Sequence, residues 1–179
     1  MPEQTARHAH QHELDAPPWL RVESTLMATA RALRDAYDAR FASLGLNLTQ
    51  ASMLAYVLEF GPVTQTKIAD HLRLGRAAIG ATIDRLQERG LLERTADAED
   101  RRVWRVRLSA EGIAIAEQIA AIDAVLRAEL RDGISRPERQ ALADVLTRLQ
   151  HNLQRATTST PASSPSPPSS TPASTTETP

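Results

Sequence analysis

The segment from Gly75 to Arg89 has the residue types and the spacing needed to read the edges of DNA bases. Its hydrogen-bond donors share one face of a predicted helix, opposite the apolar face, and are Arg76, Thr82 and Arg85. Small residues fill the first turns, where they would let the backbone approach a base edge closely; these are Ala77, Ala78, Gly80 and Ala81. A B-DNA major groove is roughly 12 Å wide and admits one helix. The segment therefore predicts a DNA-reading helix.

The elements around this helix predict how it is positioned. A short helix capped by Thr64 precedes it. Two short strands, Leu91–Thr95 and Val103–Leu108, follow it and enclose the charged stretch 96–102. Two short helices, a tight turn and a two-stranded hairpin together form a winged helix-turn-helix arrangement.

Charge gives this interpretation only modest support. The chain carries a net charge of −1. The segment from Lys67 to Arg107 has ten Lys or Arg against seven Asp or Glu, which is +3, so the rest of the chain carries −4. A locally basic segment is a weak footprint of nucleic-acid binding, and an ordinary solvated surface remains an equal alternative.

Composition bounds the remaining function classes. Aromatic residues make up 3% of the 179 residues, so the core must be built from Leu, Ile, Val and Ala, which favours helix. The absence of cysteine excludes disulfides, thiolate metal sites and a thiol redox switch. No apolar run approaches the roughly 18 residues of a membrane span, so we expect a cytoplasmic protein. No catalytic motif, metal-binding pair or phosphate loop is present, which predicts a non-enzyme without cofactor or metal.

The chain divides into an arm, one domain and a tail. Residues 1–18 are polar and predicted to be a flexible arm, and in residues 156–179 Ser, Thr and Pro supply 20 of 24 positions, which predicts a disordered tail. Residues 19–155 form the predicted domain, mainly α with a small β-hairpin wing (α+β). Long helices are expected over 19–44 and 110–154, flanking a DNA-binding part over 48–108. The predicted helix caps are Thr49, Thr64, Ser109 and a Ser135–Glu138 capping box.

The motifs from Leu72 to Ser109 resemble the MarR family of winged helix-turn-helix transcriptional regulators. The run from Leu72 to Arg94 looks like that family's recognition helix and first wing strand. The sequence Asp100-Arg101-Arg102-Val103-Trp104-Arg105-Val106-Arg107-Leu108-Ser109 matches its wing signature, Asp-x-Arg-x-x-x-Val-x-Leu-Thr/Ser. Gly75 departs from the family, which usually has Ser or Thr there, so one phosphate contact is expected to be missing.

The resemblance implies a homodimer that binds a pseudo-palindromic operator in double-stranded DNA, acting as a repressor. It implies that the wing tip enters the minor groove of the DNA. Asp100 would orient Arg102, and either Arg101 or Arg102 would reach into that groove. The implied DNA-binding residues are Thr64, Gln65, Arg76, Ala77, Ala78, Ala81, Thr82, Arg85, Asp100, Arg101 and Arg102. The long helices at both ends of the domain are implied to interleave with those of a second subunit.

The resemblance also implies a small aromatic or lipophilic effector held between the dimerisation helices and the winged part. The candidate ligand-binding residues are Trp19, Arg21, Arg34, Tyr37, Met53 and Tyr56, with either arginine pairing an anionic group. An equal alternative is that the aromatic residues are simply core. Trp19 suggests the urate-responsive branch, but Ser52 stands where that branch needs Asp, which argues against urate.

Two further interpretations stay open. His8, His10 and His12 alternate along the arm, but three histidines without a carboxylate frame favour an adventitious cluster over a metal site. The rival function is a helical scaffold that binds protein partners without binding DNA. Weak, salt-sensitive binding to random duplexes would distinguish a regulator from such a scaffold.

Overall fold

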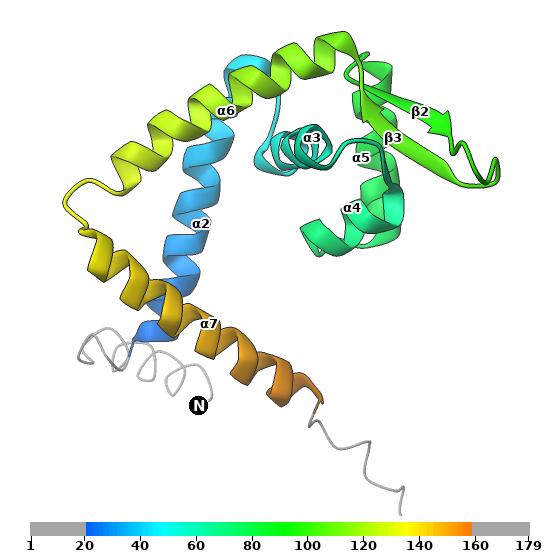
Figure 1. Cartoon of the computed structure of the whole chain (residues 1–179). Coiled ribbons are helices and arrows are strands. Elements are labelled where there is room, and N and C mark those ends of the chain that lie inside the picture. Colours follow the sequence, from blue (N-terminus) through cyan, green and yellow to red (C-terminus); the bar gives the residue numbers. More distant parts are fainter. Residues whose placement is uncertain (1–20, 159–179) are drawn as a thin grey trace, which may run out of the picture. The chain divides into compact units, whose positions relative to one another are not determined.

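A computed structural model describes residues 21–158, and these residues fall into two compact units that are described separately (Figure 1). The first unit ends at Leu130 and the second begins at Arg131. The predicted arm over residues 1–18, Trp19, the three arm histidines and the tail beyond residue 158 lie outside the described residues.

The first unit contains most of the helices and all of the described strands. In chain order its elements are α2 (Val22–Phe41), the short 3-10 helix η2 (Ala42–Leu44), α3 (Leu48–Phe60), β1 (Val63–Thr64), α4 (Gln65–Leu72), α5 (Arg76–Glu88), β2 (Leu92–Ala96), β3 (Trp104–Leu108) and α6 (Ala110–Leu130). The described part of the second unit is the single helix α7 (Arg136–Thr158). The helix therefore continues three residues past the predicted domain end at residue 155.

Most predicted helix boundaries match the structure, and one cap differs. Thr64 caps α4, since its Oγ1 accepts the Lys67 amide at 3.4 Å. Ser135 and Glu138 form the predicted capping box at the start of α7. The prediction of Thr49 as the cap of α3 was wrong: Asn47 is the cap. Its side chain accepts the Gln50 amide while the Gln50 side chain accepts the Asn47 amide, so two free donors are satisfied together.

The wing is part of a three-stranded antiparallel sheet in the order β1-β3-β2. The β2–β3 hairpin pairs Leu92 with Leu108 at its root and Ala96 with Trp104 toward its tip. The sequence predicted these two strands within one residue at each end, but it did not predict β1. That two-residue strand pairs Val63 with Val106 and ties the loop before α4 to the base of the wing.

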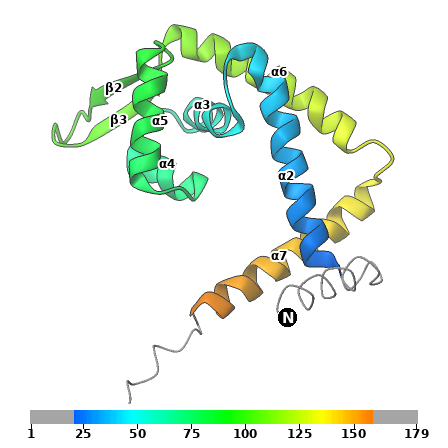
Figure 2. The same ribbon diagram turned by 180° about the vertical axis from the view of Figure 1, so that it is seen from behind.

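The core lies in the winged part of the first unit and is built by residues of α3, α4, α5 and the sheet. Figures 1 and 2 show the ribbons of these elements together in both views. Its fully buried side chains come from α3, α4, α5 and both wing strands: Met53, Leu54, Ile68, Ile79, Ile83, Leu86, Leu92 and Val106. Helix α6 closes this core through Ile119. The two DNA-reading elements predicted from the sequence are therefore mounted on one shared apolar core.

The start of α6 is locked to the root of the wing. Ser109 Oγ accepts the Gly112 amide at 2.9 Å and donates to the Gly90 carbonyl at 2.5 Å. A Cβ at Gly112 would stand 2.0 Å from the Leu91 carbonyl oxygen, which is inside any permitted contact. Only glycine therefore lets α6 approach the backbone before β2 this closely.

Helices α2 and α7 contrast with this core. Phe41 is the one buried residue of α2, and no residue of α7 is buried. Within residues 21–158, no individual helix has the length and apolar character for a membrane span, and α2 with α3 meets that test only as a pair bent by 73°.

Candidate nucleic-acid interface and small-molecule pocket

Helix α5 presents its predicted DNA-reading face to solvent. Arg76, Ala77 and Ala78 in the first turn are exposed, as is Arg85 two turns later. The opposite face is fixed in the core, because Ile79 and Ile83 are completely buried. Gly75 caps the helix without a side-chain hydrogen bond, as the sequence indicated. The first amides of α5 and the guanidinium groups of Arg76 and Arg85 are thus available to a ligand.

The turn between α4 and α5 is held by backbone geometry and by Gln65. Arg73 ends α4 in the left-handed region with φ of 52°. Gln65 Nε2 donates to the Arg76 carbonyl at 3.0 Å, and a Cβ at Gly80 would lie 3.1 Å from that nitrogen. Gln65 therefore joins the two helices, and Gly80 makes room for it.

Two of the predicted DNA-binding hydroxyls also make local bonds. Thr64 Oγ1 caps α4, and Thr82 Oγ1 donates to the Ala78 carbonyl at 2.8 Å. With Gln65, these side chains position the two helices in this structure, and each keeps further hydrogen-bonding capacity.

The wing tip is organised by Asp97, which the sequence analysis did not single out. Its carboxylate accepts the amides of Glu99 at 2.9 Å and Asp100 at 3.2 Å and pairs with the Arg105 Nε. The bond from Arg105 is the largest cause that lowers the Asp97 pKa from 3.8 to about 2, followed by the two amides. Arg105 also reaches the Pro62 carbonyl at 3.3 Å, so the tip is tied back to the loop before β1.

Asp100 contacts Arg102 by a different route from the one the resemblance implied. Its Oδ1 accepts the backbone amide of Arg102 at 2.9 Å, which closes the tip turn. The ion pair of the tip is instead Asp97 with Arg105. The side chains of Arg101 and Arg102 are exposed at the end of the hairpin. The tip therefore presents two arginines on a turn that carboxylates hold in shape.

Two further arginines fix the position of α5, and no local sequence pattern predicted either of them. Arg94 on β2 donates to Asp84 at 2.5 Å and Gln87 at 2.8 Å, both on α5. Arg89, just after α5, donates to the carbonyls of Gly45 at 2.8 Å and Leu44 at 3.0 Å. Helix α5 is thereby fastened to β2 on one side and to the end of η2 on the other.

A cavity of about 460 Å³ lies between α2, α3 and α6 in the first unit. Most of its wall is apolar and includes Phe41 and Ile119. Its polar lining comprises Ser52, Glu59 and a chain of three bonded side chains. In that chain Tyr37 Oη donates to Asp123 at 2.9 Å, and Arg127 Nε donates to Asp123 at 2.8 Å. Burial is the largest cause that raises the Tyr37 pKa, and the bond to Asp123 raises it further. The bond from Arg127 to Asp123 in turn raises the Arg127 pKa.

Of the five predicted ligand-binding residues that the structure describes, it brings Tyr37 alone to this cavity, while Trp19 lies outside the described residues. Met53 is completely buried in the core. Tyr56 stacks on His71 with ring centroids 4.1 Å apart. Arg21 stands just before α2 as its N-cap and Arg34 lies past the middle of that helix, and both are outside the lining. The residues that sequence reasoning missed are Asp123 and Arg127, which come from α6.

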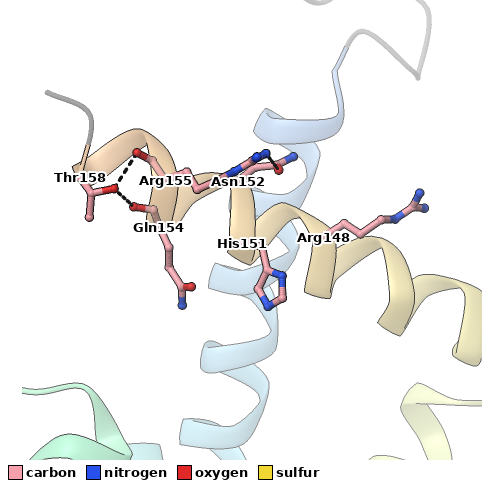
Figure 3. A pocket seen from close by; sticks show the side chains of 6 residues that line it. All are labelled: Arg148, His151, Asn152, Gln154, Arg155 and Thr158. Atoms are coloured by element: carbon pink, nitrogen blue, oxygen red, sulfur yellow. Dashed lines mark hydrogen bonds between the residues drawn. The ribbon is translucent and has the colours of Figure 1, made fainter.

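A second hollow follows one face of α7 (Figure 3). Its described lining residues are Arg148, His151, Asn152, Gln154, Arg155 and Thr158. Arg155 donates to Asn152 within the same helix at 2.7 Å. Because all six residues belong to one helix face, this hollow is not part of the candidate site.

Comparison with known proteins identifies the family. The family model described as the MarR family matches residues 44–103, which run from the end of η2 to the wing. A probable transcriptional regulator from Pseudomonas aeruginosa is 30% identical, with a TM-score of 0.59, over 72% of this chain and 99% of its own. This chain belongs to the MarR family.

Two other solved structures extend the comparison. The transcriptional regulator SlyA is 27% identical to this MarR-family chain, with a TM-score of 0.68, over 75% of this chain and 95% of its own. The S. aureus MepR–DNA complex is 19% identical, with a TM-score of 0.69, over 76% of this chain and 99% of its own. The latter likeness concerns the winged fold.

Residues 21–158 hold no cluster of three or more His, Asp or Glu side chains arranged to bind a metal.

Proposed function

We propose that this MarR-family chain is a homodimeric, sequence-specific DNA-binding transcriptional regulator that acts as a repressor. The observation that carries the proposal is the exposed face of α5, which presents Arg76 in its first turn and Arg85 in its last. Arg94 fastens this helix to a wing that ends in two exposed arginines. To place α5 in a major groove and the wing arginines in the adjacent minor groove at the same time, the helix and the wing must be held rigidly to each other. The S. aureus MepR structure of the same fold is a complex with DNA, which supports the assignment.

The dimer follows from the apolar faces of the long helices. Met27 on α2 and Leu142 and Leu153 on α7 are each more than half exposed. Large apolar side chains left exposed on a helix face support an interface on each of these helices. A two-fold dimer would place two α5 helices about one DNA turn apart and so would read a pseudo-palindrome.

The decisive experiment is to select duplexes from a random pool and measure how their affinity depends on salt. A regulator enriches a pseudo-palindrome and binds it with a steep salt dependence, since each phosphate contact contributes about one unit of slope. Arg101→Ala with Arg102→Ala should lower the slope. Arg40→Ala, which removes an exposed arginine paired with Glu129 on the long helices, should not. No enrichment and no salt-sensitive binding would contradict the proposal and favour the helical scaffold.

We further propose that a small aromatic anion occupies the cavity between α2, α3 and α6 and releases the DNA. The cavity is lined largely by apolar groups and large enough for a single ring, and Arg127 is the cation on its wall. An entering carboxylate would take the place of the Asp123 carboxylate beside Arg127. This assigns the anion to Arg127 in place of Arg21 or Arg34.

Benzoate and phenol test this assignment through the melting temperature and operator binding. Benzoate should raise the melting temperature and weaken operator binding, and Arg127→Gln should abolish both effects. Arg34→Gln serves as the control, because Arg34 lies outside the cavity lining. An unchanged response in Arg127→Gln would remove that residue from the site, and no response to either compound at millimolar concentration would remove the effector proposal.

A further inference from the structure

Trp104 is a large aromatic side chain that the wing leaves in solvent. It begins β3 and is 58% exposed. Its cross-strand neighbour is Ala96, whose methyl group covers little of an indole ring. The winged core described above makes no use of Trp104, and a tryptophan usually buries most of its large apolar surface.

The strand register shows which face of the wing carries Trp104. Residues directly opposite in an antiparallel pair lie on the same face, and that face repeats every second residue. Ala96 and Trp104 therefore share a face with the next such pair, Arg94 and Val106. Val106 is buried in the core, and Arg94 binds Asp84 and Gln87 of α5. Trp104 thus lies on the side of the wing that faces the recognition helix, about 7 Å farther toward the tip.

This location has a specific neighbour when DNA is bound. The major and minor grooves of a duplex are separated by one sugar–phosphate strand. If α5 occupies the major groove and Arg101 and Arg102 occupy the adjacent minor groove, that strand must pass between them. It then passes against the face of the wing between Arg94 and the tip, which is the face that bears Trp104.

We infer that Trp104 packs against the sugar–phosphate strand between the two grooves and acts as a base-independent DNA contact. This inference rests on the proposed DNA-binding function. The ring offers an apolar face to a deoxyribose, and its indole N–H is a donor for a phosphate oxygen. The two exposed tip arginines, which precede it in the same hairpin, suit a phosphate strand. The carboxylates of Asp97 and Asp100 beside them already bind Arg105 and backbone amides of the tip. A neutral side chain adds affinity here without adding a counterion-dependent charge.

Tryptophan fluorescence reports this contact directly. The chain has two tryptophans, Trp19 and Trp104, so the full-length Trp19→Phe protein emits from Trp104 alone. When it is titrated with a duplex selected from a random pool by the wild-type protein, its emission should be quenched. Its accessibility to acrylamide should fall severalfold at the same duplex concentration that gives the band shift.

Affinity and salt dependence supply the second readout. Trp104→Ala should weaken binding roughly tenfold, the loss expected of one buried aromatic contact, and leave the salt slope unchanged. Trp104→Phe should recover most of the affinity, since the apolar face is kept. The Arg101→Ala and Arg102→Ala variant should instead lower the slope. These different patterns separate a neutral backbone contact from a charged one.

The outcomes separate this inference from the proposed function. If the Trp19→Phe protein binds the duplex but its emission and acrylamide quenching do not change, Trp104 does not touch DNA, and the regulator assignment stands. A dimer mass that falls in Trp104→Ala with DNA-bound fluorescence unchanged would place Trp104 at a contact between copies of this chain and overturn the inference. A protein that binds no duplex overturns both.

Discussion

The winged part and the long helices of this chain differ in how much of their apolar surface they bury. Helix α3 buries five of its 13 residues, whereas α2 buries one of 20 and α7, described by itself, buries none of 23. Yet α7 still carries leucines at helical spacing, of which Leu142 and Leu153 are each 56% exposed. The difference indicates that one chain completes the core of the winged part, while α2 and α7 keep exposed apolar faces, which is the pattern expected if a second copy covers them.

The largest effect is expected from a cavity in the winged core. Leu54 is completely buried, so Leu54→Ala should lower the free energy of unfolding by about 2–5 kcal/mol per chain. Urea denaturation measures the loss, and sedimentation should still show a dimer. If Leu54→Ala kept the wild-type free energy of unfolding but became monomeric, the winged core and the long helices would not contribute separately to stability and to dimer formation.

The converse change is made on α7. Leu142→Glu with Leu153→Glu should convert the dimer to a monomer, because each leucine buried in an interface contributes about 1.5–3 kcal/mol. The melting temperature should then no longer depend on protein concentration. His151→Glu with Arg148→Glu is the matched control, since it also places two glutamates on α7, on the side away from Leu142 and Leu153. Equal effects of the two changes would show that the leucine face is not the interface.

A change on the exposed face of α5 should affect binding and leave folding intact. Arg85→Ala should weaken binding to the selected operator by about 1–3 kcal/mol if Arg85 reads a base. Its melting temperature should match that of the wild type. Arg89→Ala is the matched control, because Arg89 binds the Gly45 and Leu44 carbonyls and its loss should lower stability by about 1 kcal/mol. Operator affinity that is unchanged in Arg85→Ala would remove its role in reading DNA.

The smallest effect concerns the acid stability of the wing. The folded pKa of Asp97 is depressed from 3.8 to about 2, so the paired carboxylate stabilises the fold above pH 4. This contribution is lost as the pH falls from about 4 to 2, because the proton then displaces Arg105. Asp97→Asn should make the melting temperature less dependent on pH in this window and leave the dependence above pH 5 unchanged. Parallel curves for the two proteins would show that the ion pair does not stabilise the fold.

The sequence could predict the features whose partners are close in the chain. The α5 face, the hairpin and the Ser135 capping box each depend on residues within a few positions of one another, so periodicity and capping rules locate them. The Asn47 cap was missed because Thr49 is also a favourable cap residue, and only the reciprocal bonds with Gln50 distinguish them. The two residues of β1 are too few to show a strand period.

Features assembled from distant segments could not be predicted in this way. Tyr37 and Asp123 are 86 residues apart in the chain, and nothing in the local pattern of α6 indicates that Asp123 faces a cavity. The same holds for Arg89, which binds carbonyl groups more than 40 residues earlier. The packing of α6 against α2 places Asp123 and Arg127 at the cavity. A local pattern does not show this packing, so the prediction named Arg21 and Arg34, which lie outside the lining.

The close approach at Gly112 gives α6 the properties of a lever. With α6 held against the Leu91 carbonyl at one end and contributing Arg127 to the cavity toward the other, the two points are about 22 Å apart along the helix. If α6 tilted by about 5° about its end at the cavity, the root of the wing would move by about 2 Å. The close contact between Gly112 and the Leu91 carbonyl leaves no space that could absorb this movement. Gly112→Ala should therefore weaken the effect that ligand binding in the cavity has on the position of the wing tip. This is expected although residue 112 belongs neither to the cavity lining nor to the proposed DNA-binding residues.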